Sequence, residues 1–116
     1  MNPIVDLEKM HCTPCEGNTP KLPIAQAQTM LKDLPGWELQ GEKLHKQFKF
    51  KTFMDTIEFV QQMARLAEEE GHHPNFCVNY RELEVSLWTH AIHGLSDNDF
   101  ILAAKINALM EENLPH

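Results

Sequence analysis

Histidine is the residue type in this chain whose number and spacing point most directly to chemistry. The sequence holds seven histidines in 116 residues, and four of them, His72, His73, His90 and His93, lie between positions 72 and 93. An imidazole suits proton transfer near neutral pH, because its unperturbed pKa of about 6.5 leaves both protonation states populated. Two or three such rings around an uncharged heterocycle can supply one acid and one base. From residue types alone, ordinary surface or loop histidines explain the pattern equally well.

The elements around these histidines decide whether they can meet. Gly-His-His-Pro at 71–74 lies at the junction of an expected helix and an expected strand, and His90 ends a strand that would return beside it. Glu68 precedes the first histidine of the pair by four residues, about one helical turn. Adjacent residues of a regular strand point to opposite faces. The two neighbouring histidines therefore share a pocket only if the proline after them interrupts the regular backbone.

Hydrophobic periodicity predicts an α+β domain with the order α-β-β-α-β-β-α. Apolar residues recur at helical spacing over 24–34 and over 53–70, and a capping-box-like start at Ser96 predicts a third helix. Strands are expected at 37–40, 44–50, 75–78 and 83–89. The middle helix, capped by Thr52, has an apolar stripe made of Phe53, Ile57, Val60, Ala64 and Ala67, flanked by Met63 and Leu66. We expect one four-stranded antiparallel sheet with the three helices packed on one face.

Charge and composition exclude several classes of protein. Ten Lys and Arg against seventeen Asp and Glu leave a net charge of −7, so the basic footprint of a nucleic-acid-binding protein and the polybasic cluster of a membrane-bound one are both missing. The first residues lack the pattern of a secretory signal, and three cysteines do not form a disulfide framework. We expect a cytoplasmic protein with an irregular arm over 1–23 and a single domain over 24–116.

Cys12 and Cys15 have the spacing of a zinc knuckle or a redox pair. A structural zinc ion needs four ligands, and no second C-x-x-C or matching histidine pair follows at the expected distance. A redox motif should open a helix in a βαβ setting, which this sequence does not predict. Neither chemistry is therefore expected at these cysteines.

Several motifs taken together resemble the signature of the pterin-4a-carbinolamine dehydratases. In chain order they are Gly36-Trp37, Lys46-Gln47-Phe48-Lys49-Phe50, Glu68-x-x-x-His72-His73-Pro74, Tyr80, Thr89-His90 and Gly94-Leu95-Ser96-x-x-Asp99. The resemblance extends over residues 24–110. An isolated His-His-Pro would be a weak signal, whereas the whole series at this spacing is specific.

The resemblance implies a reaction, the loss of water from 4a-hydroxytetrahydrobiopterin to give quinonoid dihydropterin. This step regenerates the cofactor of aromatic amino-acid hydroxylases. Expelling the 4a-hydroxyl needs a proton donor, and the ring must give up a proton from nitrogen, so an acid–base pair would serve. No metal, nucleophile or redox cofactor is required.

The resemblance also implies which side chains form the site. His72, His73 and His90 are the expected catalytic residues; we assign proton transfer to His72 and His90 and orientation of the pterin to His73, and which one is the acid stays open. The residues expected to contact the pterin are Glu68, Pro74, Trp88, Thr89 and Trp37. Asp99 either supports a site histidine or caps the last helix, and the third helical position favours capping.

Two of these assignments have simple alternatives. Trp37 follows Pro-Gly and is as well explained by burial in the core as by stacking on a ring. The three glutamates at 68–70 are typical of a solvated helix end. Negative charge there opposes the helix dipole and needs compensation, which favours a role for Glu68.

Alternative functions remain open at this level. One is a non-catalytic dimerisation or partner-binding module on the same scaffold, and another is a pterin-related role in molybdopterin metabolism. A third is a metal enzyme that uses His72, His73, His90 and Glu68 as ligands. The expected partners are the pterin substrate, further copies of the chain in a homodimer or homotetramer, and an aromatic amino-acid hydroxylase.

Overall fold

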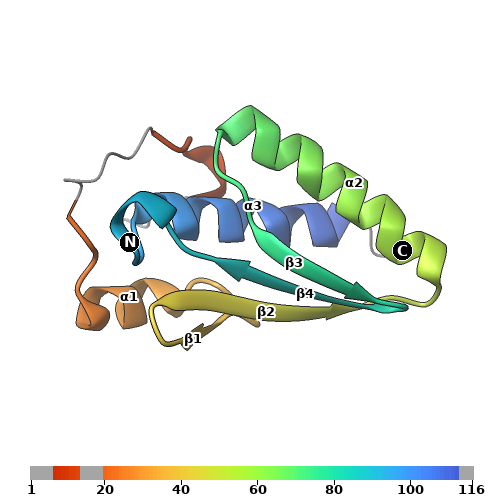
Figure 1. Cartoon of the computed structure of the whole chain (residues 1–116), viewed down its shortest axis with the longest axis horizontal. Helices are drawn as coiled ribbons and strands as arrows, with labels where there is room; N and C mark the ends of the chain where they lie inside the picture. Colours follow the sequence, from red (N-terminus) through yellow and green to blue (C-terminus); the bar gives the residue numbers. More distant parts are fainter. Residues whose placement is uncertain (1–6, 14–19, 113–116) are drawn as a thin grey trace.

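The fold is α+β, with one sheet and a layer of helices. A computed structural model describes residues 7–13 and 20–112. Three α-helices and four strands follow in the expected order, with a short 3₁₀ helix η1 (Leu7–Lys9) before them and another, η2 (His90–Ile92), before the last helix. Figure 1 shows α3 (Asp97–Glu112) running behind the sheet, with α2 (Phe53–Glu70) and α1 (Ile24–Leu31) on either side of it.

The sheet is antiparallel throughout and has the strand order β1-β2-β4-β3. Its strands are β1 (Glu38–Gln40), β2 (Lys43–Lys49), β3 (Asn75–Asn79) and β4 (Glu82–Leu87). The two hairpins lie side by side, because β2 pairs with β4 and places Leu44 opposite Leu87. The strands β1 and β3 are therefore the two edges. The expected α+β fold and element order are confirmed.

One face of the sheet and the inner sides of all three helices form a single core. Alternate residues of β4, namely Leu83, Val85 and Leu87, are fully buried. They pack in one cluster with residues such as Phe59 of α2 and Phe100 of α3. The alternation of burial along β4 is the one expected from its period of two.

The buried stripe of α2 differs from the one that the sequence predicted. Its buried residues are Thr56, Phe59, Met63 and Ala67, so of the five stripe residues expected only Ala67 is buried. Phe53 is exposed, and Ile57 and Val60 lie at the boundary. Two apolar stripes run along this helix, and the one that contains Phe59 and Met63 joins the core, where Phe59 packs on Phe48 of β2 with 5.4 Å between ring centroids.

Two further boundaries are corrected by local hydrogen bonds. The first helix ends at Leu31 instead of 34, because Lys32, Asp33 and Leu34 bond to carbonyls three residues back in tighter turns. The strand β4 ends at Leu87 instead of 89, since Thr89 pairs with Gly94 and starts a closed loop that contains η2.

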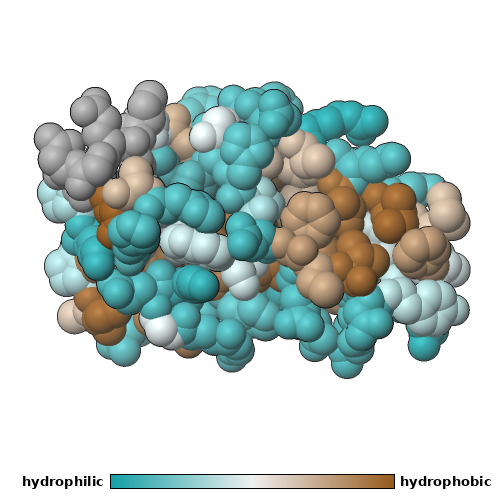
Figure 2. All heavy atoms as spheres, in the orientation of Figure 1, coloured by the Kyte–Doolittle hydropathy of each residue, from teal (hydrophilic) through white to brown (hydrophobic). Residues whose placement is uncertain are grey.

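An apolar surface remains on the side of β3 and α2. Phe76 and Tyr80 are exposed on and just after β3, and Phe53 and Met54 are exposed at the start of α2. Figure 2 shows brown side chains gathered on this part of the molecule. Within the described ranges, no helix is long and apolar enough to cross a membrane.

Candidate active site

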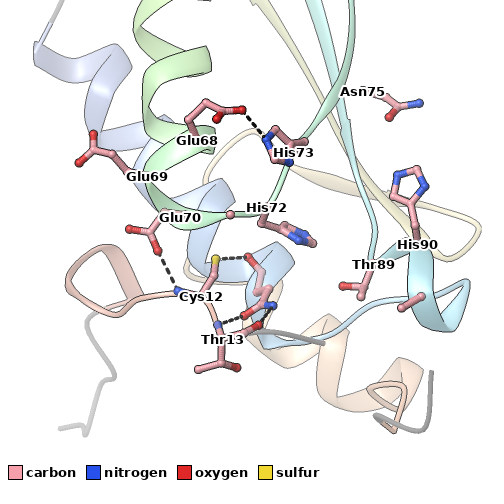
Figure 3. A pocket seen from close by; sticks show the side chains of 13 residues that line it. Cys12, Thr13, Glu68, Glu69, Glu70, His72, His73, Asn75, Thr89 and His90 are labelled. Carbon is pink, nitrogen blue, oxygen red and sulfur yellow. Dashed lines mark hydrogen bonds and ion pairs between the residues drawn. The ribbon is translucent and has the colours of Figure 1, made fainter. Parts of the chain in front are cut away.

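A cavity of about 730 Å³ lies where the end of α2, the start of β3 and the loop between β4 and α3 meet. This volume is in the range of pockets that bind small molecules. His72, His73 and His90 all line it, together with Glu68 and Thr89. Figure 3 shows His72 and His73 entering from the end of α2, with Thr89 and His90 on the opposite side.

The end of α2 places the histidine pair. Gly71 adopts a left-handed φ of 66°, and the amides of Gly71 and His72 donate to the carbonyls of Glu68 and Ala67. This pairing is the Schellman motif that ends many helices at glycine. The chain leaves the helix here and becomes a regular strand only at Asn75. Both neighbouring histidines can therefore face one pocket, as expected if Pro74 interrupts the regular backbone.

His72 is held by a buried carboxylate. Its Nε2 lies 2.6 Å from Oδ1 of Asp99, whose side chain is fully buried. The other oxygen of Asp99 accepts hydrogen bonds from Thr89 Oγ1 at 2.8 Å and from the Ser96 amide at 3.0 Å. The bond to the Ser96 amide caps α3. Asp99 thus combines the two roles that the sequence offered as alternatives.

His73 and Glu68 form a second, more exposed pair. Nε2 of His73 lies 2.9 Å from Oε1 of Glu68, and the two side chains are 61% and 77% exposed. Figure 3 shows the two side chains pointing toward one another at the end of α2. A contact at this exposure adds little to stability, but it restrains the orientation of the His73 ring.

His90 is positioned by an aromatic neighbour. Its ring stacks on Trp88 with 4.4 Å between centroids and 25° between planes. Nζ of Lys43 lies 4.1 Å from the centroid of the same indole. Trp88 therefore contacts the site through His90 and is not among the residues that line the cavity.

Two more of the residues expected to contact a pterin, Trp37 and Pro74, do not line the cavity. Trp37 is 5% exposed, packs edge-on against Phe48 and donates its Nε1–H to Asn107. It belongs to the core, so the assignment of Trp37 to the pocket is wrong. Pro74 lies between His73 and Asn75 in the chain. Those two neighbours line the cavity, but Pro74 does not.

Sequence reasoning missed one wall of the cavity altogether. Cys12 and Thr13, from the N-terminal arm, line it together with Glu70 and Asn98. The sequence did contain a signal for Glu70: three glutamates at a helix C-terminus oppose the helix dipole, so at least one of them needs a compensating partner. From the sequence alone, that role is expected for Glu68 instead. Cys15 lies outside the described residues.

Burial and charge perturb two groups in this wall. Burial opposes ionisation of Glu70, but hydrogen bonds from the Cys12 amide and His11, with Lys105 nearby, hold the pKa of its carboxyl below the ordinary value. The Cys12 thiol is partly buried beside that carboxylate, and burial first, then Glu70, raises its pKa to about 12. Cys12 is therefore a neutral thiol at physiological pH.

The cavity has acid–base groups but no cluster with the form of a metal site. Over residues 7–13 and 20–112, no three His, Cys, Asp or Glu side chains are arranged so that they could hold a metal ion. The alternative that uses His72, His73, His90 and Glu68 as ligands thus has no support in the geometry. Asp99 and Glu68 engage the ring nitrogens of His72 and His73 by hydrogen bonds instead.

Comparison with known proteins gives one consistent result. The family model described as pterin 4 alpha carbinolamine dehydratase matches residues 20–109. A relative from Dechloromonas aromatica, named "Putative pterin-4-alpha-carbinolamine dehydratase", is 44% identical over 106 residues, covering 91% of this chain and 95% of the relative.

Two solved structures share the fold. A transcriptional coactivator/pterin dehydratase from Brucella melitensis is 34% identical with a TM-score of 0.74, over 78% of this chain and 98% of that one. A pterin dehydratase-like protein described as a RuBisCO assembly factor in the alpha-carboxysome is 30% identical with a TM-score of 0.56, over 64% and 88%. Since the family model spans the sheet, α1, α2, most of α3 and the three histidines of the cavity, this chain belongs to the pterin-4a-carbinolamine dehydratase family.

Proposed function

We propose that this protein dehydrates 4a-hydroxytetrahydrobiopterin to quinonoid dihydropterin by histidine acid–base catalysis. The observation that carries the proposal is the convergence of His72, His73 and His90, from two separate segments, on one cavity. The reaction breaks the bond between carbon 4a and the hydroxyl, which leaves as water with a proton from the acid. A ring nitrogen gives its proton to the base.

The hydrogen bond to Asp99 supports His72 as the base. When Nε2–H of a neutral imidazole donates to a carboxylate, the proton is fixed on that nitrogen and Nδ1 carries the lone pair. Among the described residues, Nδ1 of His72 makes no hydrogen bond. This nitrogen is therefore free to take the proton from the pterin ring.

His90 then supplies the proton to the leaving hydroxyl. It faces the cavity from the side opposite His72 (Figure 3), which suits an acid and a base acting on one flat ring. Stacking on Trp88 limits the rotation of its imidazole. We assign His73, tied to Glu68, to binding and orienting the pterin.

Turnover of freshly generated 4a-carbinolamine tests the proposal. We expect His72→Ala and His90→Ala each to lower the enzymatic rate by about 10²- to 10⁴-fold, the usual contribution of a general acid or base. His45→Ala is the matched control, because His45 lies on the sheet beside Glu84 and away from the cavity. Unchanged turnover in both site variants would show that the catalytic assignment is wrong.

A second candidate is a partner-binding module without catalysis. It is favoured by one relative, the pterin dehydratase-like protein described as a RuBisCO assembly factor, and by the exposed apolar side chains of Phe76 and Tyr80. A wild-type protein that leaves the spontaneous dehydration rate unchanged would favour this candidate. The histidine pocket gives the dehydratase precedence.

The partners follow from the same proposal. The substrate is a pterin, the product serves an aromatic amino-acid hydroxylase, and the protein acts in the cytoplasm. The open edge of β3, beside exposed Phe76, supports assembly into a homodimer or homotetramer, since an uncovered edge strand needs protection. A role in molybdopterin metabolism is an alternative use of the same pterin site.

A further inference from the structure

The N-terminal arm ties together the two helix ends that carry the His72–Asp99 pair. At the end of α2, Oε1 of Glu70 accepts the Cys12 amide at 2.8 Å and Oε2 lies 2.9 Å from Nδ1 of His11. At the start of α3, the Asn98 side chain accepts the Thr13 amide at 2.9 Å and donates to the Thr13 carbonyl at 2.6 Å. The arm therefore bridges α2 and α3 through these four hydrogen bonds and a fifth, from Sγ of Cys12 to the backbone carbonyl of Asn98 at 3.6 Å.

These anchors are buried and additionally supported. The Glu70 side chain is 6% exposed, and Nζ of Lys105 lies 3.5 Å from its Oε2 while donating to the carbonyl of Glu8 at 2.9 Å. Leu7 of η1 is part of the hydrophobic core. A carboxylate at a helix C-terminus is unfavourable by itself, so three donors from the arm and α3 are needed to hold Glu70 there.

The anchors also lie next to the proposed catalytic pair in the chain. Glu70 precedes His72 by two residues, and Asn98 directly precedes Asp99. The bond from His72 to Asp99 and the bridge through the arm thus join the same two helix ends. A shift of either end by a fraction of an ångström alters both connections, and misplacement of about 1 Å can cost about 10² in rate.

We propose that residues 11–13 form a clasp that positions His72, and that Glu70 and Asn98 are positioning residues acting through the His72–Asp99 hydrogen bond. The clasp also supplies a wall of the pterin cavity through Cys12 and Thr13. It lies outside the segment matched by the family model, which begins at residue 20. This inference rests on the proposed dehydratase function.

The experiment compares three substitutions with a control. Glu70→Ala removes the anchor, Glu70→Gln keeps an acceptor for the Cys12 amide without the charge, and Asn98→Ala breaks the second anchor without touching α2. Glu58→Ala is the control, because Glu58 is an exposed glutamate on the same helix. Circular dichroism confirms folding of each variant, and Asn98→Ala keeps the test available if Glu70→Ala does not fold.

Docking of the arm is measured by alkylation with iodoacetamide under reducing conditions. The partly buried, neutral Cys12 should react at least about 100-fold more slowly than exposed Cys77 in the same molecule. Site-resolved mass spectrometry separates these cysteines from Cys15. We expect Glu70→Ala and Asn98→Ala to raise the rate at Cys12 by about tenfold or more, Glu70→Gln by less, and Glu58→Ala not at all.

Positioning of His72 is measured by kinetics and by the imidazole ¹⁵N signals. We expect Glu70→Ala and Asn98→Ala to lower kcat about tenfold with KM changing less, and to shift the His72 signals away from the pure Nε2–H tautomer. In Glu70→Gln, kcat and the His72 signals should lie between those of the wild type and those of Glu70→Ala. These changes should parallel the gain in Cys12 reactivity.

Two results would overturn the clasp. The first is a wild-type Cys12 that reacts as fast as Cys77, which would mean that the arm is not docked. The second is faster alkylation of Cys12 in the variants while kcat and the His72 signals stay unchanged. In that case the arm would cover the cavity without positioning His72. A wild-type protein without turnover would refute the proposed function alone, and His72 signals that still respond to Glu70→Ala would uphold the clasp.

Discussion

At the scale of single residues, the site depends on how one buried carboxylate distributes its hydrogen bonds. Asp99 contacts His72, Thr89 and the Ser96 amide at the same time. It therefore orients the proposed base, connects it to the loop that carries His90 and caps α3. A residue with three such partners controls the tautomer of the imidazole more firmly than an exposed pair such as His73 and Glu68.

Replacement of Asp99 by Asn tests this control. The amide keeps the size of the side chain but can offer its NH₂ group to Nε2 of His72, which would move the imidazole proton to Nδ1. We expect kcat to fall by about 10²- to 10⁴-fold with little change in KM, the range for loss of a general base. Asp97→Asn, an exposed change in the same helical turn, is the control. If Asp99→Asn kept the wild-type kcat, catalysis would not depend on the tautomer of His72.

At the scale of elements, the end of α2 is the feature that aims the histidine pair. Gly71 and Gly41 both have left-handed φ angles, 66° and 64°, and a Cβ added at either would meet nothing within 4 Å. An alanine at either position therefore lowers stability only through the left-handed backbone conformation, because its Cβ meets no other atom. Gly71 precedes the site histidines, whereas Gly41 is in the turn between β1 and β2.

The two glycines provide a matched pair of variants. We expect Gly71→Ala and Gly41→Ala to lower the free energy of unfolding by a similar amount, about 1–2 kcal/mol, because left-handed backbone is disfavoured for alanine. Only Gly71→Ala should also lower kcat, since relief of the strain redirects the chain at His72. Urea unfolding and turnover measure the two effects, and equal kcat in both variants would contradict the role given to this helix end.

At the scale of the whole molecule, the arm joins a core residue, Leu7, to the rim of the pocket. The described part of this segment is ordered by contacts with α2 and α3 that are far away in sequence, such as those from Glu70 and Asn98. Its attachment depends on an ionised carboxylate, so it should depend on pH.

The pH dependence of stability follows from the lowered pKa of Glu70. A carboxyl with a lower pKa in the folded state stabilises the fold above its unfolded pKa of about 4.3, and this stability is lost as pH falls through the folded value. The difference in free energy of unfolding between wild type and Glu70→Gln should therefore be larger at pH 7 than at pH 3. Urea unfolding at both pH values measures it, and a constant difference would show that the charge of Glu70 does not hold the arm.

The sequence by itself determined the fold class, the element order and the family. Period-two burial along β4 and the Gly-His-His-Pro junction after α2 are local patterns, and local backbone chemistry dictates them. The whole series of motifs, from Gly36-Trp37 to Asp99, was also enough to identify the family, which the family model confirms.

Only the tertiary structure decided which of two competing local options is used. The sequence offered two apolar stripes on α2, a stacking or a core role for Trp37, and three glutamates at one helix end. Packing against the sheet selected Phe59, buried Trp37 beside Phe48 and brought the arm to Glu70. These choices depend on contacts between residues distant in the chain, and burial energies of that kind leave no periodic trace in the sequence.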